Sequence, residues 1–338
     1  MVKVVRASQV DIEAAVQALR DGDLVAFPTE TVYGLGANAQ DRAAVRKIFA
    51  AKGRPPNHPV IVHLDSARFL HRWVNAVPDI AAKLAERFWP GPLTLVMPRA
   101  SNVNDVVTGG QDTVAVRVPA HPMAQQLLTA FGGGIAAPSA NRFGRLSPTR
   151  AEHVRDELGA AVRLVLDGGE CQIGLESTIV SCAGDQVRLL RPGAVSASQL
   201  RTVAPDLIIG ADTFSSRVPG SLPAHYAPTT PLSIVPSGEI DGQAEAASIG
   251  GKRVAVLAQR HPLKAHAFVT WVNAGRRPEQ YAHDLYANLR KLDWAGCQQI
   301  LVQDVPEDEH WDAVRDRLMR AATRISEAGD TGARAVLP

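Results

Sequence analysis

Residues 192–231 differ in composition from the rest of the chain and divide it into two unequal parts. They are rich in proline, serine, glycine and alanine, with prolines at 192, 205, 219, 223, 228 and 231. Structureless loops of this length are uncommon inside a compact domain, so the stretch is typical of a connector. A chain of 338 residues is long for one domain and comfortable for two. We therefore expect a first domain over residues 1–195, a connector over 196–231 and a second domain over 232–338.

Helical and strand patterns alternate on both sides of the connector, which predicts an α/β protein. In the first part, capping-box patterns at Ser8 and Thr149 predict helix starts. Strands are expected at residues 24–27, 93–97, 113–118, 134–137, 163–167, 177–182 and 187–191. After the connector, a strand at 253–257, a helix around Leu285, a strand around Ile300 and a last helix from Trp311 to Ile325 follow one another. This order predicts a small α/β domain with a parallel sheet.

Composition excludes several classes of protein. The net charge of +2 gives no strongly basic surface for nucleic acid, although a local basic patch stays open. Cys171, Cys182 and Cys297 are too few and too scattered for a disulfide framework or a zinc site. No apolar run approaches the ~20 residues of a membrane helix, and the N-terminus has no secretory pattern, so we expect a cytoplasmic protein. No histidine pair has metal-site spacing, and any metal is expected to arrive with a substrate.

The segment around Lys52 has two interpretations. Asp41 is expected to begin a helix with an apolar stripe at Val45, Ile48 and Phe49, and Lys52 falls on the same face. Lys52 could simply complement the dipole at the end of the helix. A lysine on an apolar face must, however, be paired or emerge into a cleft. Lys52 and Arg54 together suit a polyphosphate, the lysine as a point charge and the arginine as a fork.

Other segments place polar side chains at the ends of expected strands. Each could be an ordinary cap or turn, or part of a ligand site. In one of them Arg117 lies among small residues, which leaves room for a carboxylate that a guanidinium would bind in a bidentate way. The sequence lacks a GxxxxGK[ST] loop, a dinucleotide fingerprint and a nucleophile elbow. The segments are 27–36, 113–119, 136–149, 175–180 and 190–193.

Together these segments resemble the YrdC family. The matching motifs are FPTETVYGLGA, KGRPxxxPVIVHL, FWPGPLTLV, VAVRVP, APSAN, LSPT, ESTIV and LLRPG, and they cover roughly residues 8–195. The connector from Pro219 to Pro228 and the α/β tail resemble the long two-domain form of the family. The resemblance implies a twisted mixed-sheet catalytic domain with a basic cleft and a smaller C-terminal Rossmann-like α/β domain.

The resemblance also implies an activity. The family converts L-threonine, bicarbonate and ATP, with Mg²⁺, to threonylcarbamoyl-AMP and pyrophosphate, which is an adenylyl transfer. The product passes to a tRNA threonylcarbamoyl transferase complex, which modifies the adenosine next to the anticodon. The expected substrates are small molecules and no membrane is involved, while weak contact with RNA stays open. Two other functions stay open as well: an RNA-binding protein, and a carbamoyl transferase with another acceptor.

Matching the motifs residue by residue gives the expected site. The resemblance places two catalytic cations at Lys52 and Arg54. It places ATP at Lys52, Arg54, His58, Thr113, Ser139, Ser147, Arg191 and Tyr226. It places threonine at Thr31, His63, Arg117, Ala137 and Ser177.

The sequence departs from the family at two places. His58 stands where asparagine is common, and Ser221–Ala224 stand where many relatives have a methionine and basic residues. Because the family places Tyr226 against ATP, the connector is expected to cover the active site as a lid. Truncation after Arg191 should therefore reduce activity more than truncation after Pro231, which removes only the α/β part.

Overall fold

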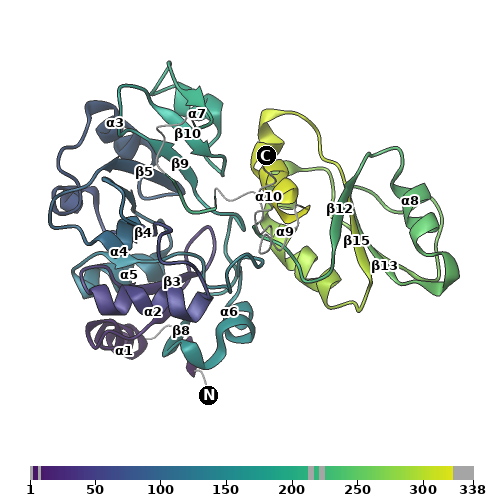
Figure 1. Cartoon of the computed structure of the whole chain (residues 1–338), viewed down its shortest axis with the longest axis horizontal. Coiled ribbons are helices and arrows are strands. Elements are labelled where there is room, and N and C mark those ends of the chain that lie inside the picture. The colour runs from purple at the N-terminus through teal and green to yellow at the C-terminus, as the bar shows by residue number, and fades with distance from the viewer. Residues whose placement is uncertain (1–2, 7–8, 212–216, 221–224, 323–338) are drawn as a thin grey trace, which may run out of the picture.

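The computed structural model describes residues 3–6, 9–211, 217–220 and 225–322. They form a large part around an eleven-stranded mixed sheet and a smaller part around a four-stranded sheet (Figure 1). The large sheet has the order β1-β8-β2-β3-β7-β4-β6-β5-β9-β10-β11. Its strands are β1 (Lys3–Arg6), β2 (Val25–Phe27), β3 (Gly34–Asn38), β4 (Ile61–His63), β5 (Leu93–Pro98), β6 (Thr113–Arg117), β7 (Ile135–Ala136), β8 (Leu164–Asp167), β9 (Thr178–Ser181), β10 (Arg188–Arg191) and β11 (Ile208–Ile209).

Helix α2 shows how local sequence positions the site. The Asp41 side chain accepts hydrogen bonds from the amides of Ala43 and Ala44, and Gly53 ends the helix with a φ of 62°. The apolar stripe of α2 packs into the main core, and Lys52 is buried on the same face. The helices of the large part are α1 (Gln9–Arg20), α2 (Arg42–Lys52), α3 (Asp79–Phe88), α4 (Asp105–Thr108), α5 (Pro122–Phe131), α6 (Ala151–Leu158) and α7 (Ala197–Arg201).

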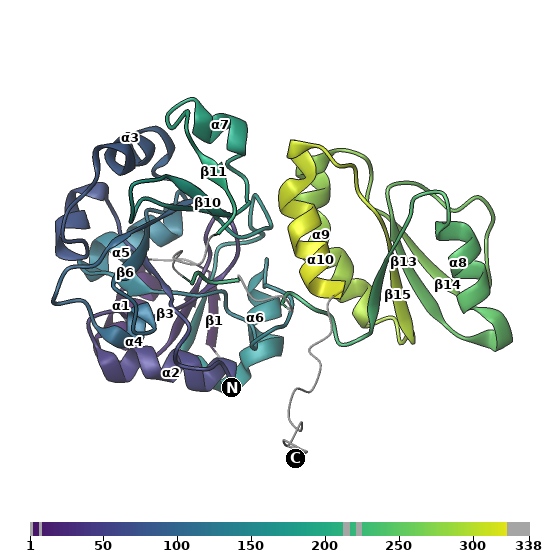
Figure 2. The ribbon, with the colours of Figure 1, turned by 45° about the horizontal axis from the view of Figure 1, so that its top comes forward.

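The smaller sheet is entirely parallel, as the sequence predicts. Its order is β12-β15-β13-β14, formed by β12 (Leu232–Val235), β13 (Val254–Ala258), β14 (Val269–Asn273) and β15 (Gln299–Gln303). Helix α8 (Ile240–Ala247) covers the face turned away from the large part. Helices α9 (Pro278–Asp293) and α10 (Asp312–Ala322) cover the opposite face, so they lie between the two sheets (Figure 2). None of the described helices is long and apolar enough to cross a membrane.

The structure corrects some local expectations. The capping box at Thr149 is wrong, because α6 begins after Arg150 without a side-chain cap, and the buried Thr149 hydroxyl has no hydrogen-bond partner among the described residues. Of the segment 27–36, only residues 28–33 lie between strands, because Gly34 already begins β3. Part of the expected connector is ordered as α7 and β11, and β11 is the edge strand of the large sheet. Ser8, the Ser221–Ala224 departures and Ile325 lie outside the described residues.

Candidate active site

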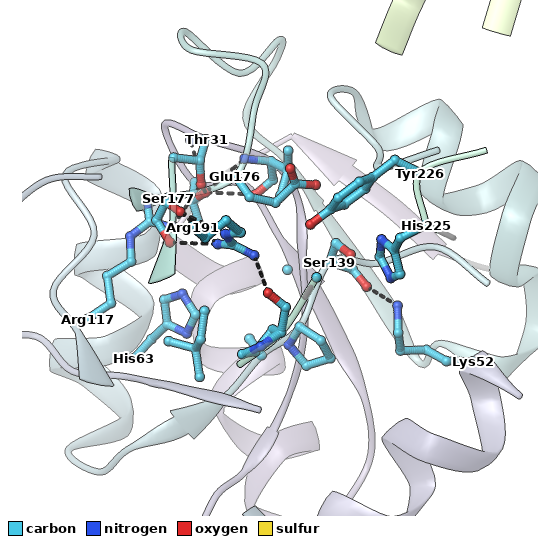
Figure 3. Close-up of a pocket in the computed structure, with 18 of the residues that line it drawn as sticks. Thr31, Lys52, His63, Arg117, Ser139, Glu176, Ser177, Arg191, His225 and Tyr226 are labelled. Atoms are coloured by element: carbon cyan, nitrogen blue, oxygen red, sulfur yellow. Dashed lines mark hydrogen bonds between the residues drawn. The ribbon is translucent and has the colours of Figure 1, made fainter. Parts of the chain in front are cut away.

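One cavity collects most of the expected site residues. It contains about 560 Å³ of space, open solvent at its mouth included. Figure 3 shows Thr31, His63 and Arg117 at one end, Lys52, His225 and Tyr226 at the other, and Arg191 and Glu176 between them. The expected residues that line the cavity are Thr31, Lys52, Arg54, His63, Arg117, Ala137, Ser139, Ser177, Arg191 and Tyr226.

Lys52 and Arg54 bring positive charge into the cavity. The Lys52 ammonium, at the end of α2, donates to the carbonyls of Ser139 (2.5 Å) and Asn141 (2.6 Å). Arg54 follows the Gly53 turn and donates to the Pro59 carbonyl at 2.8 Å. Burial, together with repulsion by Arg54, lowers the pKa of Lys52 well below its usual value, and burial lowers the pKa of Arg54 to about 10. Both cations are therefore held in a place that favours an anion.

Arg191 adds a third cation from the end of β10. Arg191 as a whole residue is 2% exposed, and its guanidinium donates to the carbonyl of Ser177 at 2.8 and 3.0 Å and to that of Pro219 at 2.8 Å. Burial lowers its pKa. Among the described residues, no carboxylate lies within ion-pair distance of Lys52, Arg54 or Arg191. Three buried cations thus share one cavity with no ion-pair partner in the described part of the chain, which is an electrostatic environment for a polyanion.

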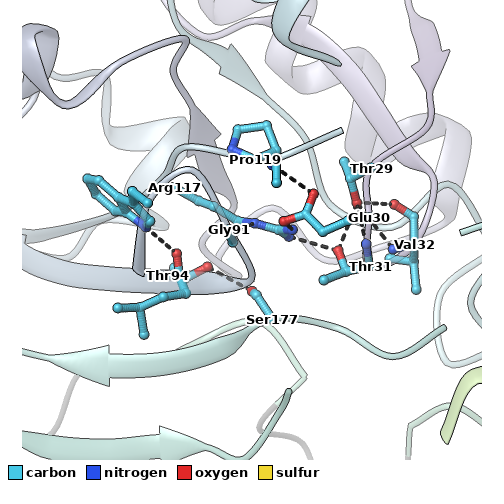
Figure 4. Close-up of polar contacts among 12 residues, drawn as sticks. Thr29, Glu30, Thr31, Val32, Gly91, Thr94, Arg117, Pro119 and Ser177 are labelled. Carbon is cyan, nitrogen blue, oxygen red and sulfur yellow. Dashed lines mark hydrogen bonds and ion pairs between the residues drawn. The ribbon is translucent and has the colours of Figure 1, made fainter. Parts of the chain in front are cut away.

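The opposite end of the cavity is built around Arg117. Its guanidinium donates to the Glu30 carboxylate at 2.6 Å, to the Thr31 hydroxyl at 2.8 Å and to the Gly91 carbonyl at 3.2 Å (Figure 4). The strand alternation of β6 places Arg117 on the cavity side and its valines in the core, as the sequence predicts. The Ser177 hydroxyl is fixed by Thr94 at 2.8 Å (Figure 4). This end offers hydroxyls and a positioned guanidinium to a small polar molecule.

Several polar atoms of the cavity wall have no hydrogen-bond partner among the residues that the structure describes. Buried and unpaired are Nε of Arg54, Nδ1 of His63, Nδ1 of His225 and the hydroxyl of Tyr226. Buried polar groups are nearly always hydrogen-bonded in native proteins, so four such atoms in one cavity indicate a ligand that pairs with them. Tyr226 also has a φ of 59°, a conformation that costs energy for a side chain of this size.

Comparison with known proteins identifies the family. The model Sua5_yciO_yrdC, described as Telomere recombination, matches residues 17–193, and a model of the threonylcarbamoyl-AMP synthase C-terminal domain matches residues 195–323. The chain belongs to the Sua5/YciO/YrdC family. It is 39% identical to a threonylcarbamoyl-AMP synthase of Pyrococcus abyssi (94% of this chain, 95% of the relative) and 40% identical to one of Bacillus subtilis (92% of each). The crystal structure of P. abyssi Sua5 complexed with L-threonine superposes with a TM-score of 0.88, at 39% identity, over 95% of this chain and 97% of that one.

Three residues that the family resemblance assigned to ATP do not line the cavity. His58 is half-buried, and its ring packs edge-on against Phe143 with 5.6 Å between centroids. Thr113 begins β6 outside the cavity wall. Ser147 is fully buried behind the wall, where its hydroxyl donates to the Glu176 carboxylate. The family motifs therefore contain residues that line the cavity and residues that do not, and of the latter Ser147 lies directly behind the wall.

The cavity also contains residues that the sequence analysis did not assign to a ligand. Glu176 belongs to the ESTIV motif and His225 to the connector, so both stood beside assigned residues. Burial and nearby cations lower the pKa of His225 to about 3, and burial and Arg117 lower that of His63 to about 3, so both imidazoles are neutral at physiological pH. The remaining unassigned wall residues are Thr29, Val32, Gly34, Ile61, Pro138, Pro219 and Gly220.

Proposed function

We propose that the chain synthesises threonylcarbamoyl-AMP from L-threonine, bicarbonate and ATP. The threonine amine adds to bicarbonate, with loss of water, to form a carbamate. A carbamate oxygen then attacks the α-phosphorus of ATP in line, a new O–P bond forms, and the bond to the β-phosphate oxygen breaks with release of pyrophosphate. This chemistry asks the protein for positioning and charge stabilisation rather than for a covalent nucleophile.

The observation that supports this proposal most is the cluster of Lys52, Arg54 and Arg191. These cations are buried in one cavity without an ion-pair partner among the described residues. A triphosphate supplies the missing negative charge, and the same cations would stabilise the charge that develops on the leaving pyrophosphate. We assign Lys52 and Arg54 as catalytic residues, and Ser139, Arg191 and Tyr226 as further ATP-binding residues.

We place threonine at the Arg117 end of the cavity. Arg117 has five N–H groups, of which three donate to Gly91, Thr31 and Glu30, so two remain for the carboxylate of the amino acid. Thr31 and Ser177 offer hydroxyls, and His63 presents an unpaired ring nitrogen. The L-threonine complex of the P. abyssi relative supports a threonine site in this fold.

The metal and the partners are part of the same proposal. Among the described residues, no group of three histidine, cysteine, aspartate or glutamate side chains is suited to a metal ion. We therefore expect Mg²⁺ to be held mainly by the ATP phosphates, where it would offset their charge. The product would pass to a tRNA-modifying threonylcarbamoyl transferase in the cytoplasm.

We further propose that the described residues of the connector after β11 cover the cavity as a lid. Pro219, Gly220, His225 and Tyr226 line the cavity from this segment. A lid would exclude water from an adenylate that hydrolyses readily.

The test is pyrophosphate release by the full chain with ATP and Mg²⁺, with threonine or bicarbonate omitted in turn. The proposal expects release to need both. Release that is equal without threonine would refute it, and retention of RNA without any ATP turnover would favour an RNA-binding function instead.

A further inference from the structure

The cavity contains one group that is unfavourable for ATP. Among the described residues, Glu176 is the only carboxylate in its wall, and its side chain is nearly buried. A free carboxylate beside a triphosphate would repel it, because like charges in a partly dry site interact strongly. What neutralises Glu176 therefore matters for ATP binding.

The counter-charge comes from the smaller part of the molecule, 141 positions further along the chain. Nε of Arg317 in α10 donates to Oε2 of Glu176 at 2.9 Å, and the hydroxyl of Tyr286 in α9 donates to the same oxygen at 2.9 Å. The other oxygen accepts a hydrogen bond from Ser147. Arg317 is fully buried and also donates to the Pro192 carbonyl at 3.1 Å. The carboxylate is thus held by two helices that belong to the other sheet.

The same arginine contacts the segment that we propose as a lid. The Arg317 guanidinium lies 5.2 Å from the centroid of the Tyr226 ring, in a cation–π arrangement. The ring of Tyr286 lies 6.0 Å from that of Tyr226. Burial by itself would raise the pKa of Glu176, but Arg317 and then Arg191 outweigh it and hold this pKa at about 2. Glu176 is therefore ionised and fully paired.

We infer that Arg317 is a positioning residue for ATP: by pairing with Glu176 it keeps this carboxylate compatible with a triphosphate and holds Ser147 and Tyr226 in place. The inference rests on the proposed function, and it gives the C-terminal domain a part in the active site. Arg317 acts through Glu176 and does not itself line the cavity. Tyr286 assists it with a neutral hydrogen bond.

A second ion pair between the two parts of the molecule provides a control for a purely structural role of Arg317. The two parts also meet at a second buried ion pair, where Arg290 of α9 pairs with Glu157 of α6 at 2.9 Å and donates to the Leu146 carbonyl at 2.6 Å. Neither Arg290 nor Glu157 lines the cavity. Arg290→Met is therefore a matched control that weakens the same interface without exposing the cavity carboxylate.

The experiment measures Kd for ATP and for L-threonine by calorimetry on the full chain, for the wild type and for Arg317→Met. We expect Kd for ATP to rise roughly tenfold or more, since an unpaired carboxylate then faces the phosphates. Kd for threonine should change far less, because threonine is a neutral zwitterion. Glu176→Gln combined with Arg317→Met should restore the Kd for ATP to within about threefold, since the amide keeps hydrogen-bonding groups but has no charge. The Arg290→Met variant should show no preferential loss of ATP binding and no rescue by Glu176→Gln.

The pH dependence gives a second readout. Without Arg317, burial dominates and the pKa of Glu176 rises, so protons neutralise it as the pH falls. In Arg317→Met the Kd for ATP should thus fall as the pH becomes more acidic. The wild type and the double variant Arg317→Met with Glu176→Gln should show a smaller fall. Other ionisable groups also face Glu176, but all of them are present in every variant, so they do not account for a difference between variants. They are Lys52 of α2, Arg191 of β10, His225 and Tyr226 of the connector and Tyr286 of α9, and Asp316 of α10 lies beside Arg317.

The outcomes separate the two proposals. An unchanged Kd for ATP in Arg317→Met, or equal losses for ATP and threonine without rescue by Glu176→Gln, would overturn the inference. If Arg317→Met does not fold, Arg317→Gln is the second neutral variant, since its amide still donates to the carboxylate, and the same criteria apply. Threonine-dependent pyrophosphate release by the wild type is measured in parallel and tests the proposed function alone. A wild type that binds no ATP at all overturns both.

Discussion

Replacement of Lys52 by methionine separates a phosphate-binding lysine from a lysine that only ends a helix. Methionine keeps much of the apolar stem but removes the ammonium. A charge about 4 Å from a phosphate contributes roughly 4 kcal/mol at an effective dielectric constant of 20, and loss of one donor at a transition state typically costs ~10²–10³-fold in rate. If Lys52 only complemented the helix dipole, the loss would be about 0.3–1 kcal/mol, or less than about sixfold. The two hypotheses therefore differ by more than tenfold in kcat/KM for ATP.

The assay is threonine-dependent pyrophosphate release, with a thermal melt of each variant. Lys47→Met is the matched control, because Lys47 lies on the same helix with half of its side chain exposed and contacts the Gly22 carbonyl at 2.6 Å, away from the cavity. We expect Lys52→Met to lose at least ~10²-fold in kcat/KM and Lys47→Met to stay near the wild type. The reasoning fails if Lys52→Met keeps activity within about fivefold of the wild type and only its melting temperature falls.

Three further predictions follow from the same site. Because burial and Arg54 lower the pKa of Lys52, affinity for ATP should be full below this lowered pKa and be lost as the pH rises through it. KM for ATP should therefore rise with pH at values below the usual pKa of a lysine, and KM of the Lys52→Met variant should not show this rise. A Cβ at Gly220 would lie 2.0 Å from the Tyr226 hydroxyl, whereas one at Gly210, which also has positive φ, meets nothing within 4 Å; Gly220→Ala should thus raise KM for ATP well above the value for Gly210→Ala, and equal values would contradict a role for Tyr226. A site that binds the threonine hydroxyl should favour threonine over valine on the order of 10⁴-fold in kcat/KM, and comparable values would count against it.

Local sequence rules predicted the parts of the site that one helix or strand determines. Asp41, the apolar stripe and Gly53 fix the length and rotation of α2, and this rotation predicts that Lys52 lies on the apolar face, where it must be paired or emerge into a cleft; the structure shows it at the cavity. Alternation along β6 similarly predicts that Arg117 points away from the core valines. The pairing of Arg117 with Glu30 was not predictable in this way, because the two residues lie 87 positions apart and meet only when the sheet forms.

The sequence analysis did not predict the buried contact between the two parts of the molecule. Helices α9 and α10 nevertheless carry the same signal as α2, a cation on a buried face. Arg317 lies three positions after Val314 and four before Ala321, so it falls on the buried face of α10, as Lys52 does on α2. Arg290 lies four positions after Tyr286 on the buried face of α9. A cation on an apolar helix face needs a partner, and this rule would have predicted that Arg317 and Arg290 each make a buried contact with another part of the chain. The sequence could not name Glu176 as that partner, since its position depends on how the two sheets are docked.

The docking of α9 and α10 against the large part bears on the expectation that the α/β part contributes less to activity than the connector does. The end of the connector is held by the helices of that part: the His225 amide donates to the Arg320 carbonyl at 3.2 Å, and the amides of Thr229 and Thr230 donate to the Asp293 carboxylate at 2.9 and 2.7 Å. Asp293 also pairs with Arg145 of the large part at 3.2 Å. Removal of α9 and α10 would take away these contacts as well as the partner of Glu176. We therefore expect that the lid cannot be assigned to the connector alone, because its position over the cavity depends on the C-terminal helices that hold it.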